Sequence, residues 1–135
     1  MKAKTFKLQK LAQRMEKQIN TLTNQLKKYK NVIAIIQFGS SLTKNFKPLS
    51  DIDIAVIAKN PSKKLESEIN SNSSNIFDVV NFNRLPLYIQ FNVLKTGKTI
   101  FVRNKKEFSN IQSHILREYL RMSYFYERLS KRILV

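Results

Sequence analysis

The chain has 135 residues, of which 42% are hydrophobic, with a mean hydropathy of −0.35 and a formal net charge of +16. This length fits a single domain over residues 1–135 with a modest core. The lack of cysteine excludes disulfides and thiolate metal sites, and the lone histidine, His114, excludes a site that needs two imidazoles. No apolar run could cross a bilayer and no signal-peptide pattern follows the N-terminal lysines, so we expect a cytoplasmic protein without a membrane partner.

The positive charge lies at the two ends of the chain. Residues 1–30 carry nine Lys/Arg against one acid, residues 83–135 carry eleven against three, and residues 31–82 carry five against five. Such flanks suit an RNA, DNA or acidic protein partner. An AT-rich genome, which raises Lys, Asn and Ile together, also explains the charge and the 13 Asn. Both explanations stay open.

The first half of the chain predicts one long helix and two strands. Apolar residues recur at spacings of three and four over residues 7–30, which predicts a helix laid on a sheet, with a coiled-coil seam as the alternative. Residues 32–38 (VIAIIQF) form a β-branched apolar run that is typical of a strand buried on both faces. A polar connection over residues 39–50 leads to a second such run over residues 52–58 (IDIAVIA).

Shorter elements follow. A polar stretch contains a predicted helix at residues 63–69, and residues 76–82 (IFDVVNF) predict a third strand. A short helix is expected to begin at Pro86 and to end before Gly97, because proline suits the first turn of a helix and glycine its end. Residues 99–103 are predicted to add a brief strand.

A second long helix is predicted over residues 105–134. One side of it is lined by Phe108, Ile111, Ile115, Tyr119, Met122, Tyr126, Leu129 and Ile133, and widened by Leu116, Leu120 and Phe125. This apolar arc is broader than one sheet contact needs, which suits either a partner interface or a core helix of a small domain. Together the elements predict the α/β (α+β) class, with a small mixed sheet flanked by helices.

The segment FGSSLTKNFKPLSDIDIAV carries the residues that indicate chemistry. Gly39 and Ser40 turn out of a predicted buried strand, where backbone N–H groups and a hydroxyl could donate to phosphate oxygens. Asp51 and Asp53 lie two residues apart, so their carboxylates share one strand face, roughly 6–7 Å apart. The isoleucines that follow each of them point to the other face, into the expected core. They repel each other unless a cation lies between them, and hard oxygen ligands suit Mg²⁺.

Asp78 on the third predicted strand adds a third carboxylate. It shares a strand face with Ile76, Val80 and Phe82, so an ionised Asp78 would stand among apolar neighbours. That placement is costly unless the carboxylate is paired or bound to metal. Joined to the other two aspartates, it would complete a site for a pair of magnesium ions.

The spacing of these residues resembles a known family. Gly39-Ser40, ten residues and then Asp51-x-Asp53 resemble the G-S-x10-D-x-D signature of the polymerase-β-like nucleotidyltransferase superfamily. The downstream segment NIFDVVNFNRLPLYIQFNVLKTGKTIFVR resembles its minimal nucleotidyltransferase (MNT) branch, with a third aspartate, a helix starting near proline and a K-x-G-K turn. The resemblance covers roughly residues 20–105 and implies the polymerase-β-like nucleotidyltransferase fold.

The resemblance also implies two-metal nucleotidyl transfer from ATP with Mg²⁺, or alternatively Mn²⁺. The catalytic and metal-binding residues would be Asp51, Asp53 and Asp78, and the nucleotide-binding residues would be Gly39, Ser40 and Ser41. Asp78 would ligate the catalytic metal and help to orient or deprotonate the acceptor hydroxyl. The loop departs from the family pattern G-S-x-A-x-G at Lys44, which stands where the pattern has its second small residue.

A partner protein follows from the same resemblance. Minimal members commonly act as antitoxins of helical HEPN-family RNase toxins, to which they transfer AMP on a tyrosine, so the resemblance implies a HEPN partner here. Two alternatives stay open: a nucleotidyltransferase acting on RNA ends or a small molecule, and a basic nucleic-acid-binding protein with a vestigial site. A homo-oligomer also stays open.

Overall fold

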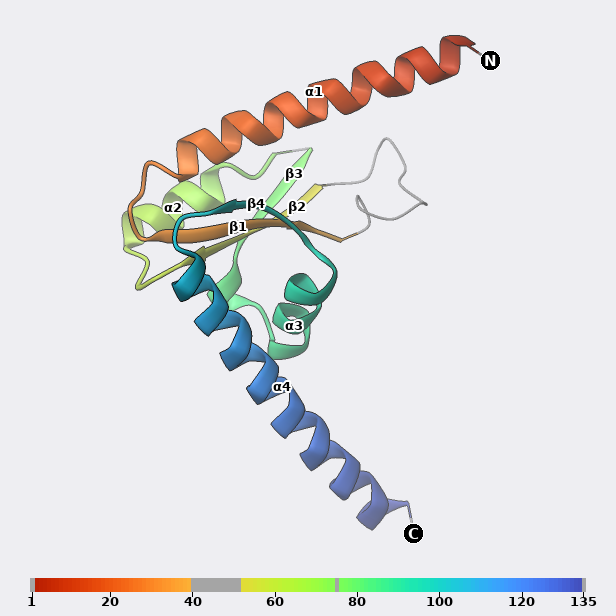
Figure 1. Cartoon of the computed structure of the whole chain (residues 1–135), viewed down its shortest axis with the longest axis vertical. Helices are drawn as coiled ribbons and strands as arrows, with labels where there is room; N and C mark the ends of the chain where they lie inside the picture. The colour runs from red at the N-terminus through yellow and green to blue at the C-terminus, as the bar shows by residue number, and fades with distance from the viewer. Residues whose placement is uncertain (1, 40–51, 75, 135) are drawn as a thin grey trace.

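The computed structural model describes residues 2–39, 52–74 and 76–134, and its centre is a four-stranded mixed sheet with helices on both faces (Figure 1). The strand order is β3-β2-β1-β4. β1 (Val32–Phe38) runs antiparallel to both β2 (Ile52–Ala58) and β4 (Lys98–Val102), while β2 runs parallel to β3 (Phe77–Asn81). The predicted α/β class and small mixed sheet flanked by helices are confirmed.

One face of the sheet is covered by α1 (Lys2–Leu26) and α2 (Lys63–Ser71). The buried cluster on this face comprises Leu22 and Leu26 of α1, Leu65 and Ile69 of α2, and strand residues such as Ile35, Ile52, Ile54, Val56 and Val79. The start of α2 is fixed by Ser62, whose Oγ accepts a hydrogen bond from the Leu65 N–H at 3.2 Å. The C-terminal half of the apolar stripe predicted along the first helix therefore packs against this face of the sheet.

The opposite face is covered by the 3₁₀ turn η2 (Phe82–Arg84), by α3 (Leu87–Thr96) and by the first half of α4 (Lys105–Ile133). Its buried cluster comprises Ile33, Ala34, Ile36, Ala55, Ile57, Phe82, Val93, Phe108 and Ile115. Phe91 of α3 and Tyr119 of α4 stack with ring centroids 3.8 Å apart. Both β1 and β2 are thus buried on two faces, as their continuous apolar sequences predict.

The first helix is shifted from its predicted range, 7–30, to residues 2–26. It ends early because the chain turns after Leu26: the Tyr29 N–H donates to the Leu26 carbonyl at 3.2 Å, and the Val32 N–H donates to the Tyr29 carbonyl at 3.1 Å. Its start lies earlier because no proline or glycine interrupts residues 2–6. Tyr29 still packs against the core from the turn.

The other boundaries differ by one or two residues. The third strand was predicted over residues 76–82 but covers Phe77–Asn81, because Asn81 Oδ1 accepts the Asn83 N–H at 3.1 Å and starts a turn at Phe82. Pro86 precedes α3 as its N-cap and Gly97 follows it as its C-cap. α2 ends at Ser71 rather than 69, β4 covers 98–102 rather than 99–103, and α4 ends at Ile133 rather than 134.

Both long helices extend past the sheet. The N-terminal part of α1 and the C-terminal part of α4 leave the body of the fold, and the two chain ends lie far apart (Figure 1). Among the residues that the structure describes, no helix is long and apolar enough to cross a membrane.

Candidate functional site

The end of β1 and the starts of β2 and β3 meet at one end of the sheet. Phe38 is the register partner of Asp53 across β1 and β2, and Asp53 is the register partner of Asp78 across β2 and β3. Neighbouring strands lie about 4.8 Å apart, so Asp53 and Asp78 stand side by side on adjacent strands. Gly39 follows Phe38 directly and completes this end, which we call the carboxylate end.

Both aspartates belong to the sheet face that carries α3 and α4. Asp53 alternates with Ile52 and Ile54, which are buried in the cluster under α1 and α2, and it shares parity with Ala55 in the cluster on the opposite face. Asp78 occupies the matching register position of the parallel ladder. The prediction that Ile52 and Ile54 point into the core while Asp53 points to the other face is therefore confirmed.

Gly39 lies against the Asp53 carboxylate. Its φ is +86°, a backbone conformation that residues with a side chain rarely adopt. A Cβ at this position would overlap Asp53 Oδ2 and lie 3.1 Å from Asp53 Cγ. Glycine is thus required at this position for two reasons: the backbone conformation disfavours a side chain, and the half-buried carboxylate occupies the space where a side chain would lie.

The predicted surroundings of Asp78 are wrong. The side chain of Asp78 is exposed, Ile76 before β3 is 42% exposed, and Phe82 belongs to η2 instead of the strand. The physical reason is that β3 is the edge strand of the sheet, so its first residues border solvent. Asp78 therefore borders solvent and is accessible to a molecule that approaches this end of the sheet.

The remaining predicted site residues, Ser40, Ser41 and Asp51, lie outside the described residues. So does Lys44, the residue that departs from the family pattern. In residues 2–39, 52–74 and 76–134 there is no group of three or more His, Cys, Asp or Glu that could hold a metal ion. The described part of the site supplies two carboxylates on adjacent strands beside a glycine. That donor set fits a hard divalent cation such as Mg²⁺, which takes its other ligands from phosphates and water.

The sequence did not single out a cavity of about 420 Å³ at the same end of the sheet. It lies between α1 and the β1–β4 edge and is lined by residues that include Met15, Ile19, Gln37 and Lys98. Because this cavity contacts α1, it opens on the face opposite Asp53 and is not part of the carboxylate site. No local pattern in the sequence joins these residues, which come from three separate elements. His114 is exposed on α4.

Comparison with known proteins yields a family match. The family model described as "Polymerase beta, Nucleotidyltransferase" matches residues 20–106, a segment that contains Gly39, Asp53 and Asp78. A protein of Methanocaldococcus jannaschii, named as a candidate protein adenylyltransferase, is 34% identical over 70 residues. That match spans 52% of this chain and 56% of the relative, so the chain matches a little over half the length of that relative.

Solved structures share the fold. A toxin–antitoxin complex with AMP-PNP contains a chain that superposes with a TM-score of 0.66 at 18% identity, covering 89% of this chain and 98% of that one. A complex of a tri-AMPylated Shewanella oneidensis HEPN toxin with an MNT antitoxin gives a TM-score of 0.62 at 18% identity, covering 91% and 98%. At such identities the similarity establishes the architecture alone.

Proposed function

This chain belongs to the polymerase-β nucleotidyltransferase family, and we propose that it transfers AMP from ATP, with Mg²⁺, to a tyrosine of a HEPN-family RNase toxin, acting as its antitoxin. The observation that carries the proposal is the Asp53–Asp78 register pair beside Gly39, inside the segment that the family model matches. Carboxylates on neighbouring strands next to a side-chain-free turn form a place where a metal and a phosphate can meet.

The relatives support the choice of nucleotide and acceptor. One solved toxin–antitoxin complex contains AMP-PNP, an analogue of ATP. In another, the HEPN toxin is tri-AMPylated and bound to an MNT antitoxin. The Methanocaldococcus jannaschii relative is named for protein adenylyl transfer. All three observations concern those proteins, and they favour ATP as donor and protein as acceptor for this chain.

Each site residue has a proposed task. Asp51, Asp53 and Asp78 hold Mg²⁺, and Gly39, Ser40 and Ser41 bind the phosphates. Bound Mg²⁺ supplies positive charge that offsets the negative charge of the triphosphate. Because Gly39 has no side chain, the Asp53 carboxylate can lie directly against its backbone, which would bring the carboxylate next to the backbone groups proposed to bind phosphate.

The proposed reaction replaces a phosphoanhydride bond of ATP by a phosphoester bond to the tyrosine. The tyrosine Oη attacks the α-phosphorus of ATP, an Oη–P bond forms, the bond from the α-phosphorus to the bridging oxygen breaks, and pyrophosphate leaves. The phenolic proton is lost during attack, and Asp78 orients the hydroxyl and accepts that proton before passing it to water. Its exposure at the edge strand suits an acceptor that is carried by another protein.

The test is transfer of label from ATP labelled at the α-phosphate, in the presence of Mg²⁺. The acceptors are a purified HEPN-family protein from the same organism, tRNA, and an aminoglycoside, each with wild-type protein and with Asp53→Asn. We expect label on a tyrosine of the HEPN protein with wild type and none with Asp53→Asn. Label on tRNA or on the aminoglycoside instead would overturn the proposed acceptor.

The same reagents separate the non-catalytic alternative. A basic nucleic-acid-binding protein with a vestigial site would bind RNA with strong salt dependence, and Asp53→Asn would leave that binding unchanged. It would transfer no label to any acceptor. That combination would contradict an enzymatic role.

A further inference from the structure

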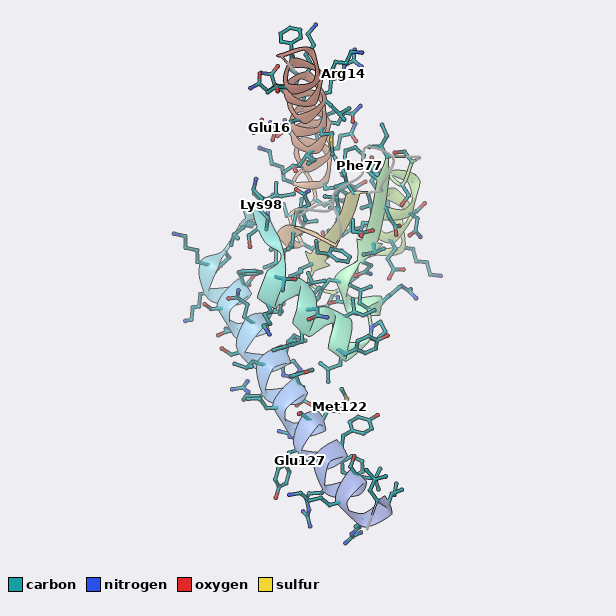
Figure 2. All side chains as sticks on the ribbon, turned by 90° about the vertical axis from the view of Figure 1, so that its right-hand side faces the viewer. Arg14, Glu16, Phe77, Lys98, Met122 and Glu127 are labelled. Carbon is teal, nitrogen blue, oxygen red and sulfur yellow. The ribbon has the colours of Figure 1, made fainter. Side chains whose placement is uncertain are left out.

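The second half of α4 extends beyond the sheet and α3. The stacked pair of Phe91 and Tyr119 joins α3 to α4, and the helix then continues to Ile133. Figure 2 shows Met122 and Glu127 on the part of α4 that extends beyond the sheet and α3. An unsupported helical segment of this length is marginal in water, because most helical stability in proteins comes from packing an amphipathic face.

This segment nevertheless keeps an apolar face. At 100° per residue, Met122, Phe125, Leu129 and Ile133 fall on the same side of α4 as Phe108, Ile111 and Ile115, which pack against the sheet. Phe125 is 61% exposed and Ile133 is 70% exposed. The stripe that packs in the first half of α4 thus continues without a covering element in the described structure. We call Met122, Phe125, Leu129 and Ile133 the distal stripe.

Arginines border the distal stripe. Arg128 and Arg132 line a shallow hollow together with Phe125 and Leu129. The two carboxylates on this part of α4 or just before it already have partners within the helix: Glu118 lies 3.3 Å from Arg121, and Glu127 lies 3.7 Å from Lys131. Among the described residues, Arg128 and Arg132 make no ion pair with a carboxylate. An occupant of this face would therefore meet apolar side chains beside two guanidinium groups.

A second copy of this chain is a poor occupant. Pairing two distal stripes would bring the Arg128 and Arg132 pairs of both copies together without free carboxylates to offset them. Each chain also carries a net charge of +16, which opposes self-association. Nucleic acid would suit the arginines but would leave the aromatic and aliphatic side chains against phosphate and water. The combination of charge and apolar area fits a protein groove with an apolar floor and an acidic rim.

We propose that the distal stripe with Arg128 and Arg132 is the docking helix for the protein acceptor, and that it inserts into an apolar groove bordered by carboxylates. The inference rests on the proposed function, because it takes the HEPN-family protein as the occupant. It adds that binding and chemistry lie on separate parts of the molecule. The carboxylate end transfers the nucleotide, and α4 anchors the protein that receives it.

The test compares two pairs of variants in the full chain, using the same HEPN-family protein as the probe. Phe125→Gln with Leu129→Gln removes apolar side chains that are already exposed, so the fold is retained; Phe6→Gln, at an exposed aromatic on α1, is the matched control. Arg128→Glu with Arg132→Glu reverses the charge; Lys63→Glu with Lys64→Glu makes the same charge change on α2. Binding is measured by calorimetry. Label transfer is measured separately, as a function of acceptor concentration.

We expect the glutamine pair to weaken binding about a hundredfold, as loss of central apolar anchors does, while Phe6→Gln leaves it unchanged. The Arg128/Arg132 reversal should weaken binding about tenfold at low salt and less at high salt, mainly through a slower association rate. In transfer assays the KM for the acceptor should rise while kcat at saturating acceptor is retained. The Lys63/Lys64 reversal should change neither value.

Three results would overturn the inference. Wild-type binding and transfer by the glutamine pair would place the docking surface elsewhere while leaving the proposed function intact. A dimer of the isolated chain in sedimentation that Phe125→Gln with Leu129→Gln dissociates would identify a second copy as the occupant. Wild-type protein that binds RNA through Arg128 and Arg132 but no HEPN protein would overturn both the inference and the proposed acceptor.

Discussion

The two ends of the sheet are built differently. At the end where β1 starts and β2, β3 and β4 finish, side-chain and backbone hydrogen bonds join the strands to neighbouring segments. We call this the tied end. Arg103 Nε donates to the Val32 carbonyl at 2.9 Å, Asn83 Nδ2 donates to the Ala58 carbonyl at 3.0 Å, and the Lys59 N–H donates to the Asn31 carbonyl at 2.8 Å. The carboxylate end instead presents Asp53 and Asp78 beside a glycine.

The difference indicates that the two ends of the sheet serve different purposes, one chemical and one structural. The like charges of Asp53 and Asp78 on adjacent strands repel each other, and a cation bound between them would relieve that repulsion. The register that places them side by side is fixed by the shared core and by the tied end. Changes to the two carboxylates should therefore affect nucleotide transfer more than stability, and changes to the hydrogen bonds at the tied end should affect mainly the free energy of unfolding.

The largest effect is expected from Asp53→Asn. The variant keeps the size of the side chain but removes the charge, so transfer of label should fall by about 10²–10³-fold, as when one preorganised electrostatic group is lost. Because it relieves repulsion with Asp78, the metal-free variant should unfold at the same temperature as wild type or slightly higher.

Thermal unfolding with and without Mg²⁺ provides the check. A cation that binds only the folded state raises the melting temperature of wild type, and it should not raise that of Asp53→Asn. An equal shift in both proteins would show that Asp53 is not a metal ligand. Ca²⁺ and Na⁺ at matched ionic strength control for general salt effects.

Gly39→Ala should damage both the site and the fold. Alanine at φ +86° is strained by about 1–2 kcal/mol, and its Cβ would displace the Asp53 carboxylate. Gly97→Ala is the matched control: its Cβ would collide with the Val93 carbonyl and the Ile36 side chain, and overpacking of this kind costs about 1–3 kcal/mol. We expect comparable losses in urea unfolding, with the Mg²⁺-induced stabilisation lost only in Gly39→Ala.

Arg103 is the clearest test of the tied end. Its guanidinium donates to the carbonyls of Lys27, Tyr29 and Val32, and so joins the turn after α1 to β1 and to the end of β4. Arg103→Ala should lower the free energy of unfolding by about 2 kcal/mol, because several charge-assisted hydrogen bonds at a partly exposed site are lost. Arg103→Lys should recover less than half, since an ammonium group cannot reproduce the fork. Mg²⁺ affinity should not change, and a parallel loss of that affinity would argue against the separation of the two ends.

Much of this arrangement could be predicted from the sequence because it is local. The apolar runs VIAIIQF and IDIAVIA are buried strands with the predicted bounds, and Pro86 and Gly97 flank a short helix as predicted. Alternation along the second strand correctly separates Ile52 and Ile54 from Asp53. In each case a few neighbouring residues and one periodicity decide the outcome.

The features that could not be predicted depend on strand order or on contacts between segments that lie far apart in the chain. The exposure of Asp78 follows from the place of β3 at the edge of the sheet, which the sequence around it does not encode. The carbonyl partners of Arg103 lie more than 70 residues away in the chain. The early end of α1 depends on a turn that Arg103 helps to hold, so periodicity alone placed that helix too far along the chain.

The smallest expected effect concerns the ion pair of Arg84 and Glu66, near the tied end. Arg84 Nη2 lies 3.1 Å from both carboxylate oxygens of Glu66, but the Arg84 side chain is 72% exposed. A double-mutant cycle with Arg84→Ala and Glu66→Ala should give a coupling energy of about 0.5 kcal/mol that disappears in high salt. Glu66 also accepts from Asn81 at 3.5 Å, so Glu66→Ala alone should cost slightly more than Arg84→Ala alone. A coupling as large as the Arg103→Ala effect would mean that this exposed ion pair stabilises the tied end as much as the hydrogen bonds of Arg103 do.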